Sequence, residues 1–233
     1  PSLVLRAPYE PNDKRRAGSM MEHGWTMPAW KPQKLPQADG SYSADDAAYN
    51  EFMKDGYKYD TIQNTRQGGS MNGTRSTIAK YVVGPGQKYG GEQVIGMNTG
   101  INFMMLRYAD ILLIYAEATL GEAATTSDAT ALEAFNKVRL RAGLPVKEVL
   151  TLNDIMKERR VEFAFEGDYW FDITRQGFTK AKQIIEAQNR GTMPGNPYRV
   201  TNFTEDKMFL PIPASEVLQD PLLNEDPEPY YTK

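Results

Sequence analysis

Three glutamates spaced four residues apart, Glu158, Glu162 and Glu166, form the most regular pattern of chemically active side chains in this sequence. On a helix, this spacing places the carboxylates along one face, as in a metal site or a pair of glycosidase carboxylates. Arg159 and Arg160 are interleaved with them, however, and the two carboxylates of a glycosidase usually come from separate elements. The pattern therefore favours ion pairing within the protein.

Arg159 also lies on an apolar stripe. It follows Met156 by three residues and precedes Phe163 by four, so a helix places all three side chains on one face. Because an unpaired buried charge is strongly destabilising, the sequence predicts a carboxylate partner for this arginine.

An acidic and aromatic group, DYWFD, follows at 168–172. A sugar-binding platform is one interpretation of these rings. The crowding of Trp170 between two further aromatic residues favours a packed corner instead, in which Asp168 or Asp172 pairs with an arginine of the 159–160 pair. We expect structural roles for Arg107, Arg159, Arg160, Glu162, Glu166, Asp168, Trp170 and Asp172.

Composition excludes several kinds of chemistry. The sequence has no cysteine, and its only histidine is His23, which removes zinc sites of the Cys/His type and cysteine nucleophiles. The net charge of −3 comes with no basic stripe, so nucleic acid is not an expected partner. The longest apolar run, at 111–116, is far shorter than the roughly 20 residues that span a bilayer. We expect no cofactor, and a structural cation such as calcium stays open.

Residues 1–100 differ in composition from the remainder. They hold 13 glycines and 7 prolines but only 10 Ile, Leu or Val residues, so we expect loops laid over a scaffold. Aromatic residues lie among the glycines without a helical or strand period, as expected of exposed rings that contact a ligand or anchor a loop. The predicted ligand contacts are Trp25, Trp30, Tyr42, Tyr57 and Tyr59, with Asn72 and Arg75 as polar partners.

Residues 101–233 supply the scaffold, and the predicted fold class is mainly α. Apolar periodicity and end signals predict helices at 103–120, closed by Gly121, at 128–142, closed by Gly143, and at 151–167, opened by a capping box at Thr151. Shorter helices are expected at 168–176 and 179–190, before an irregular proline-rich tail. The helix at 103–120 is apolar nearly all round, so we expect it to pack on several sides.

Four strings, in chain order, resemble the successive C-terminal signatures of the SusD/RagB family: MLRYADILLIYAEA, ALEAFNKVRLRAGLP, IMKERRVEFAFEGDYWFDITRQG and FLPIPASEV. Upstream, NDKRR at 12–16 resembles the family's Asp-Pro-Arg segment with Lys14 in place of proline, and IAKYVV at 78–83 resembles its Lys-Tyr strand. The chain departs from the family at its end, where NEDPEPYY replaces the usual closing phrase.

The resemblance implies a tetratricopeptide-like helical scaffold with long loop-rich insertions, of which this chain is a C-terminal portion. It implies a glycan-binding lipoprotein on the extracellular face of the outer membrane, attached through an N-terminal lipid outside this chain. Its partners would be a SusC-like TonB-dependent transporter and the missing N-terminal half, which would grip the helix at 103–120.

Three alternatives are open at this point. A peptide-capturing member of the same family would use the same scaffold. A tetratricopeptide-type adaptor would need several consensus repeats, whereas the sequence offers one helical pair. A glycosidase would need a catalytic pair of carboxylates, and no segment singles one out. We therefore expect a binding protein and not an enzyme.

Overall fold

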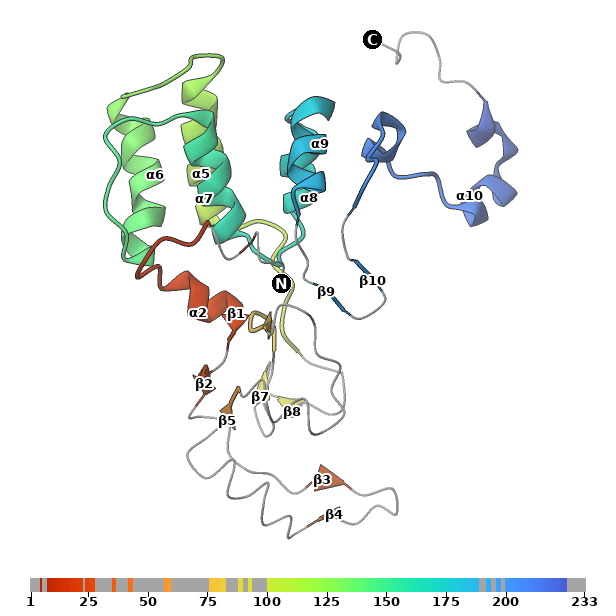
Figure 1. Ribbon diagram of the computed structural model, residues 1–233, viewed down its shortest axis with the longest axis horizontal. Coiled ribbons are helices and arrows are strands. Elements are labelled where there is room, and N and C mark those ends of the chain that lie inside the picture. Colours follow the sequence, from red (N-terminus) through yellow and green to blue (C-terminus); the bar gives the residue numbers. More distant parts are fainter. Residues whose placement is uncertain are drawn as a thin grey trace.

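The computed structural model describes residues 5, 8–22, 24–27, 59, 76–82, 100–188 and 200–225, together with the backbone of short strands at 35–36, 42–43, 57–58, 88–89, 92–93, 192–193 and 196–197. Its main helices are α5 (Tyr108–Leu120), α6 (Ala129–Ala142), α7 (Leu152–Glu162), α8 (Tyr169–Thr174) and α9 (Phe178–Glu186). The described part is mainly helical, as the sequence predicts (Figure 1).

The first long helix, α5, begins at Tyr108 instead of residue 103. Arg107 has an extended backbone, with φ −126° and ψ 155°, and its guanidinium group bonds to Glu162 and Glu166. The apolar residues before it, at 103–106, are therefore not helical, which corrects the predicted start. The predicted stop is confirmed, because Gly121 ends the helix with a φ of 54°.

The next two helices begin at side-chain caps. The Asp128 carboxylate accepts hydrogen bonds from two backbone N–H groups at the start of α6, and Gly143 ends that helix with a left-handed φ of 82°. Thr151 and Asp154 form the predicted capping box at the start of α7. That helix ends at Glu162 and not at residue 167, because the left-handed conformation that breaks it already occurs at Phe165, with a φ of 68°.

The main core lies between α5, α6 and α7. Its buried members come from the inner faces of these helices and from the loops that join them: Leu113, Ala116, Leu120, Phe135, Val138, Leu150, Ile155 and Phe163. The helices α5 and α6 run side by side in opposite directions, in the manner of one helical repeat (Figure 1). The predicted apolar face of α6 is confirmed, because Ala131, Phe135, Val138 and Ala142 are all buried.

The opposite side of α5 is not covered by the described residues. Its exposed apolar residues are Tyr108, Ile111, Ile114 and Tyr115. Within the described part, this helix packs mainly against α6 and α7, and the expected packing on its remaining sides is not tested there. Coverage of the outer face by a further part of the protein stays a prediction.

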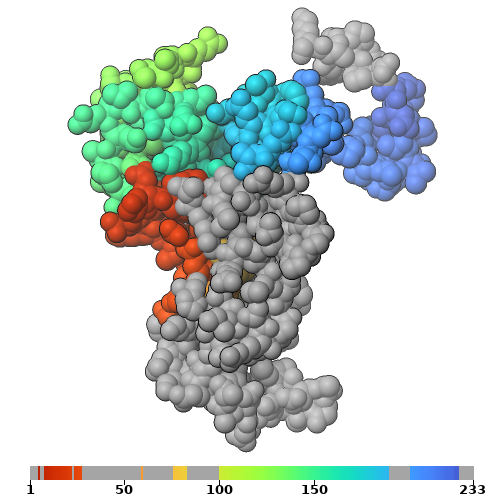
Figure 2. Space-filling model, in the orientation of Figure 1, coloured from red at the N-terminus to blue at the C-terminus, as the bar shows by residue number. Residues whose placement is uncertain are grey.

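A second, smaller core joins α8 and α9 to the chain that returns at 200–208. It contains Ile173, Ala181, Ile185 and Phe203. The segments η1 (Glu205–Met208), α10 (Ala214–Gln219) and η2 (Pro221–Asn224) follow, and the last two stand to one side of the helical body, in blue (Figures 1 and 2). The tail thus contains short helical turns that the sequence does not predict.

The N-terminal segment places α2 (Arg15–Ser19) against one end of α6 and α7, drawn in red in Figures 1 and 2. Lys14 N–H donates to the carbonyl of Ala142 at 3.1 Å. Two antiparallel strand pairs extend from α2: β1 (Met20–Met21) pairs with β6 (Thr77–Ile78), and β2 (Thr26–Met27) pairs with β5 (Tyr57–Lys58).

The remaining strands are short antiparallel pairs. They are β3 (Leu35–Pro36) with β4 (Tyr42–Ser43), β7 (Lys88–Tyr89) with β8 (Glu92–Gln93), and β9 (Thr192–Met193) with β10 (Asn196–Pro197). The division of the chain at residue 100 stays a prediction, because much of 28–99 lies outside the described residues. Within the described part, no helix is both long enough and apolar enough to span a bilayer.

Candidate functional site

The structure describes few of the side chains predicted to contact ligand. Trp30, Asn72 and Arg75 lie outside the described residues, and only the backbone of Tyr42 and Tyr57 is described, in β4 and β5. Their predicted roles stay predictions. Trp25 and Tyr59 are the two whose side chains can be placed.

Trp25 and Tyr59 come together where β2 and β5 pair. Tyr59 N–H donates to the carbonyl of Trp25 at 2.7 Å, and the indole N–H of Trp25 donates to the carbonyl of Ala17, also at 2.7 Å. Both rings join a small apolar cluster with Met21. Tyr59 is only 8% exposed, which favours an anchoring role for it. Trp25 is half-buried and keeps ring surface that a ligand can contact.

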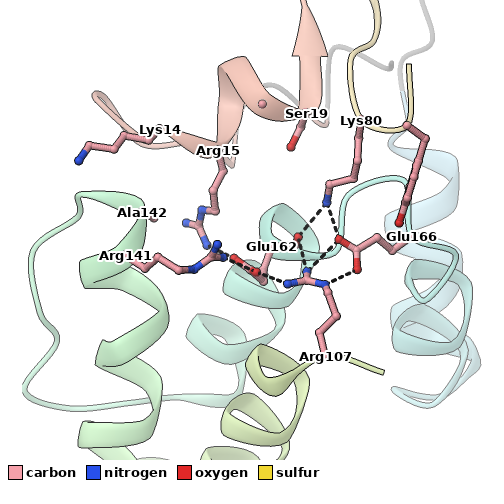
Figure 3. A pocket seen from close by; sticks show the side chains of 11 residues that line it. Lys14, Arg15, Ser19, Lys80, Arg107, Arg141, Ala142, Glu162 and Glu166 are labelled. Atoms are coloured by element: carbon pink, nitrogen blue, oxygen red, sulfur yellow. Dashed lines mark hydrogen bonds and ion pairs between the residues drawn. The ribbon is translucent and has the colours of Figure 1, made fainter. Parts of the chain in front are cut away.

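A second group of predicted residues forms a network of ion pairs centred on Glu162. The side chain of Glu162 is 1% exposed and accepts hydrogen bonds from three arginines. The three donors are Arg107 at 2.9 Å, Arg141 at 2.5 Å and Arg15 at 3.2 Å. Figure 3 shows their guanidinium groups converging on this carboxylate from α2, from the start of α5 and from α6.

The network extends in two directions along α7. Toward the start of the helix, Glu158 accepts hydrogen bonds from Arg15 at 2.6 Å and Arg139 at 3.0 Å. Arg139 in turn pairs with Glu10, and Arg15 also pairs with Asp13 at 2.8 Å. The N-terminal segment is thus joined to the helices at several points.

Beyond the end of α7, Glu166 accepts hydrogen bonds from Arg107 at 2.7 Å and from the ammonium group of Lys80. These contacts confirm the ion-pair interpretation of the three regularly spaced glutamates. Their carboxylates are bonded to arginine and lysine side chains. Among the described residues, no group of three or more His, Cys, Asp or Glu side chains could hold a metal ion.

Burial and pairing have opposite effects on the charges of this network. Burial alone would raise the pKa of Glu162, but the hydrogen bonds from Arg107 and Arg15 and the charges of Arg141 and Arg107 lower it below its ordinary value. Burial would likewise lower the pKa of Arg15, whereas its bonds to Asp13 and Glu158 raise it. Glu162 is therefore ionised at neutral pH, and Arg15 is charged.

A cavity of about 450 Å³ opens beside this network, between the N-terminal segment and the ends of α6 and α7 (Figure 3). Its charged lining residues are Lys14, Arg15, Lys80, Arg107, Arg141, Glu162 and Glu166. Most of these groups are already bonded to one another, so the cavity wall is a satisfied structural junction. These bonds hold Arg15 of the N-terminal segment and Lys80 against the helical part.

The ion pair predicted between the DYWFD segment and the 159–160 arginines forms between Asp172 and Arg159. Arg159 Nε lies 2.9 Å from both carboxylate oxygens of Asp172, and Nη1 bonds to Asp110 at 2.5 Å. The expected carboxylate partner of this buried arginine is therefore confirmed. Arg175 bonds to the same Asp172 from the solvent side at 3.0 Å, and to Glu117.

Arg160 and Asp168 do not form the alternative ion pair. The Nε atom of Arg160 is buried and has no hydrogen-bond partner among the described residues, and its guanidinium group lies 4.8 Å from the ring centroid of Tyr169. Burial lowers its pKa. Trp170 packs edge-on against Phe203, with centroids 6.2 Å apart, in agreement with a structural role. Asp168 has no ion partner among the described residues, so Asp172 is the aspartate that forms the predicted pair with an arginine of the 159–160 pair.

Several members of the Glu162 network are absent from the predicted site residues, among them Arg15, Lys80, Arg139 and Arg141. A signal for the first two was present in the sequence. Arg15 lies in the NDKRR segment and Lys80 in IAKYVV, the two upstream likenesses to the SusD/RagB family. Arg139 and Arg141 lie in ALEAFNKVRLRAGLP, another string that resembles the family, although charged residues near the end of a helix are common and do not by themselves predict ion pairs.

Comparison with known proteins points to the same family as the strings quoted in the sequence analysis. A "SusD-like protein" of Bacteroides ovatus is 34% identical, over 77% of this chain and 39% of its own length. A crystal structure described as being with xylogluco-oligosaccharide is 32% identical, with a TM-score of 0.70 over 98% of this chain and 46% of that one. The chain thus spans less than half the length of these relatives.

A more distant structure, surface glycan-binding protein A from Bacteroides uniformis, is 24% identical, with a TM-score of 0.55 over 94% of this chain and 38% of that one, and it shares the fold. The sequence profile of the SusD family matches residues 5–231, which is nearly the whole chain. The family signatures include the residues that form the charged junction between the N-terminal segment and the helices. The chain therefore belongs to the SusD family.

Proposed function

We propose that the protein carrying this chain binds glycans at the cell surface and delivers them to a SusC-like TonB-dependent outer-membrane transporter. It acts by binding, without catalysis, on the extracellular face of the outer membrane and attached through an N-terminal lipid. The observation that carries the proposal is the 32% identical relative, alike over 98% of this chain, whose crystal structure is described as being with xylogluco-oligosaccharide.

The arrangement of the chain supports a structural role for the helices and a binding role for the 1–100 segment. On α7, the side chains of Glu158, Arg159 and Glu162 are bonded in internal ion pairs, so they fix the scaffold. The aromatic residues of the 1–100 segment are the ones with chemistry suited to a sugar, since Trp and Tyr rings pack against the C–H face of a pyranose. Trp25 is the described example, held by its indole N–H while part of its ring stays exposed.

The energetics favour modest affinity. Aromatic contacts contribute roughly 0.5–1.5 kcal/mol each beyond the burial of their area. Two or three such contacts give a few kcal/mol, which is closer to a millimolar Kd, about −4 kcal/mol, than to a nanomolar one, about −12 kcal/mol. Weak capture suits a protein that must release its ligand to a transporter.

The test uses the full-length protein and affinity electrophoresis on a panel of polysaccharides, with peptides as a second panel. We expect the wild type to be retarded by at least one glycan and by no peptide. The variant in which Trp25 and Trp30 are both replaced by alanine should lose retardation, whereas Phe209→Ala, a matched loss of an exposed aromatic ring in the C-terminal segment, should keep it.

Two results would contradict the proposal, and a third would contradict only the role given to the two tryptophans. Binding of peptides but no glycan would point to a peptide-capturing protein. Release of reducing ends from a bound glycan would indicate a glycosidase. Unchanged retardation of the double variant would remove the two tryptophans from the site, although glycan binding by the wild type would stand.

A further inference from the structure

A second cavity, of about 560 Å³, lies on the helical part between α5 and α8. We call it the Phe171 cleft. Its lining residues are Ile114, Glu117, Ala118, Gly121, Arg159, Asp168, Phe171, Asp172 and Arg175. A volume of this order is in the range of small-molecule sites in proteins. None of its members is among the residues that we predict from sequence to contact ligand.

Phe171 differs from the aromatic residues beside it. Tyr169 lies beneath the guanidinium group of Arg160, and Trp170 packs against Phe203, so both rings are used inside the protein. Phe171 is 64% exposed. On the α5 side of the cleft, Ile114 is half exposed, whereas Ala118 and Gly121 have little or no side chain. Within the described part, the cleft therefore has the exposed ring of Phe171 on one side and the small residues Ala118 and Gly121 on the other.

The polar groups of the cleft are held in place. Arg175 is bonded to both Glu117 and Asp172, and Arg159 is bonded to Asp172. Because these groups are fixed by one another, they present donors and acceptors at set positions. Asp168 is different, since its carboxylate has no hydrogen bond or ion pair with any described residue. It is the free acceptor of the cleft.

The charge of the lining selects among ligands. Three carboxylates, those of Glu117, Asp168 and Asp172, face two guanidinium groups. Burial and the nearby charge of Asp110 raise the pKa of Asp168, as expected for a carboxylate in an acidic surrounding. A uronic acid or a sulfated sugar would add a further negative charge at this point. A neutral hydroxyl-rich ligand would not, and its hydroxyl groups can donate to a free carboxylate.

We propose that the Phe171 cleft is a contact site for a neutral sugar residue of the glycan, which packs its C–H face on Phe171 and donates hydroxyl hydrogen bonds to Asp168. This inference rests on the proposed glycan-binding function and adds to it a site on the helical scaffold, away from the loop-rich segment. It also states a ligand class, neutral in preference to acidic glycans.

The experiment measures the Kd of the full-length protein for a neutral polysaccharide and for an acidic one, by affinity electrophoresis. Phe171→Ala should weaken binding of the neutral glycan by about tenfold, because it removes the ring surface. Phe171→Tyr keeps the ring and should bind within about twofold of the wild type, an expectation based on the shared ring face. Asp168→Asn should weaken binding of the neutral glycan and bring its Kd closer to the Kd for the acidic one. Phe209→Ala is the control.

The competing occupant is a further segment of the polypeptide that covers Phe171 in the full-length protein. In that case Phe171→Ala would lower the melting temperature and leave the Kd unchanged, which would overturn the inference. A wild type that binds glycan, with all four variants equal to it, would also overturn the inference while leaving the proposed function intact. A wild type that binds no glycan would instead overturn the proposed function itself.

Discussion

Replacing Glu162 by glutamine tests whether the charged junction stabilises the protein. The substitution keeps the size of the side chain and removes the charge that three arginines share. Hydrogen bonds to charged groups contribute about 1.5–3 kcal/mol each, so the sum of three such bonds is an upper bound on the free energy of unfolding that the substitution removes. The loss is smaller, because Arg15 keeps Asp13 and Glu158, Arg107 keeps Glu166, and the Arg141 side chain is 61% exposed to water.

We therefore expect Glu162→Gln to lower the free energy of unfolding by about 3 kcal/mol, the lower end of the cost of breaking one side of a buried ion pair. The measurement is urea denaturation of the full-length protein at pH 7. Glu133→Gln is the matched control, since it removes the same charge from an exposed pair with Lys137, and it should leave the denaturation midpoint unchanged.

The dependence on pH gives a second readout of the same prediction. The pKa of Glu162 is lower in the folded protein than in the unfolded chain. Its contribution is therefore complete above the unfolded pKa of about 4.3 and is lost as the pH falls through the folded pKa. The difference between wild type and Glu162→Gln should be constant from about pH 7 to about pH 5 and should shrink below about pH 4. Equal stability of Glu162→Gln and Glu133→Gln at pH 7 would refute the reasoning.

Three further predictions follow from the structure, each measured as a change in the free energy of unfolding. Gly143→Ala should destabilise by about 1–2 kcal/mol, because Gly143 has a φ of 82° and a Cβ atom there would lie 3.0 Å from the side chain of Lys14; Gly18→Ala, in α2 with no atom near the new methyl group, should be neutral or stabilising, and equal effects would contradict this account. Thr151→Ala should cost about 1 kcal/mol by removing the cap of α7, while Thr151→Ser should retain most of it. Arg159→Ala should cost about 3–5 kcal/mol, because it leaves the buried carboxylate of Asp172 with only the more exposed Arg175; a loss below about 1 kcal/mol would show that the pair is not a buried one in solution.

The sequence predicts the helices well because their signals are local. The apolar period, the cap at Thr151 and the glycine stops at Gly121 and Gly143 all lie within a few residues of the ends that they define. The start of α5, predicted at residue 103 and found at Tyr108, depends instead on distant contacts. Arg107 leaves the helix to reach Glu162 and Glu166, which are 55 and 59 positions away, and an apolar pattern carries no information about them.

The same distinction applies to the candidate site. The need of Arg159 for a carboxylate follows from its place on an apolar stripe, but the choice of Asp172 over Asp168 depends on how α8 turns against α7. The exposure of Phe171 could not be predicted either, since its two aromatic neighbours are equally suited to the surface. The predicted ligand contacts in the loop-rich segment rest on residue type alone. Residue type does not distinguish a buried ring such as that of Tyr59 from a ring that contacts ligand.

The attachment of α2 to α7 also has a consequence for the order of folding. Arg15 bonds to Glu158 and Glu162, which are 143 and 147 positions further along the chain, whereas α5 and α6 are joined by a short loop. Contacts of such sequence separation form slowly, because a long loop must close before they contribute. The helical hairpin of α5 and α6 should therefore form early and the 10–19 segment dock late. In native-state hydrogen exchange, the amides of α2 should be among the first to open, well before those of the helical core.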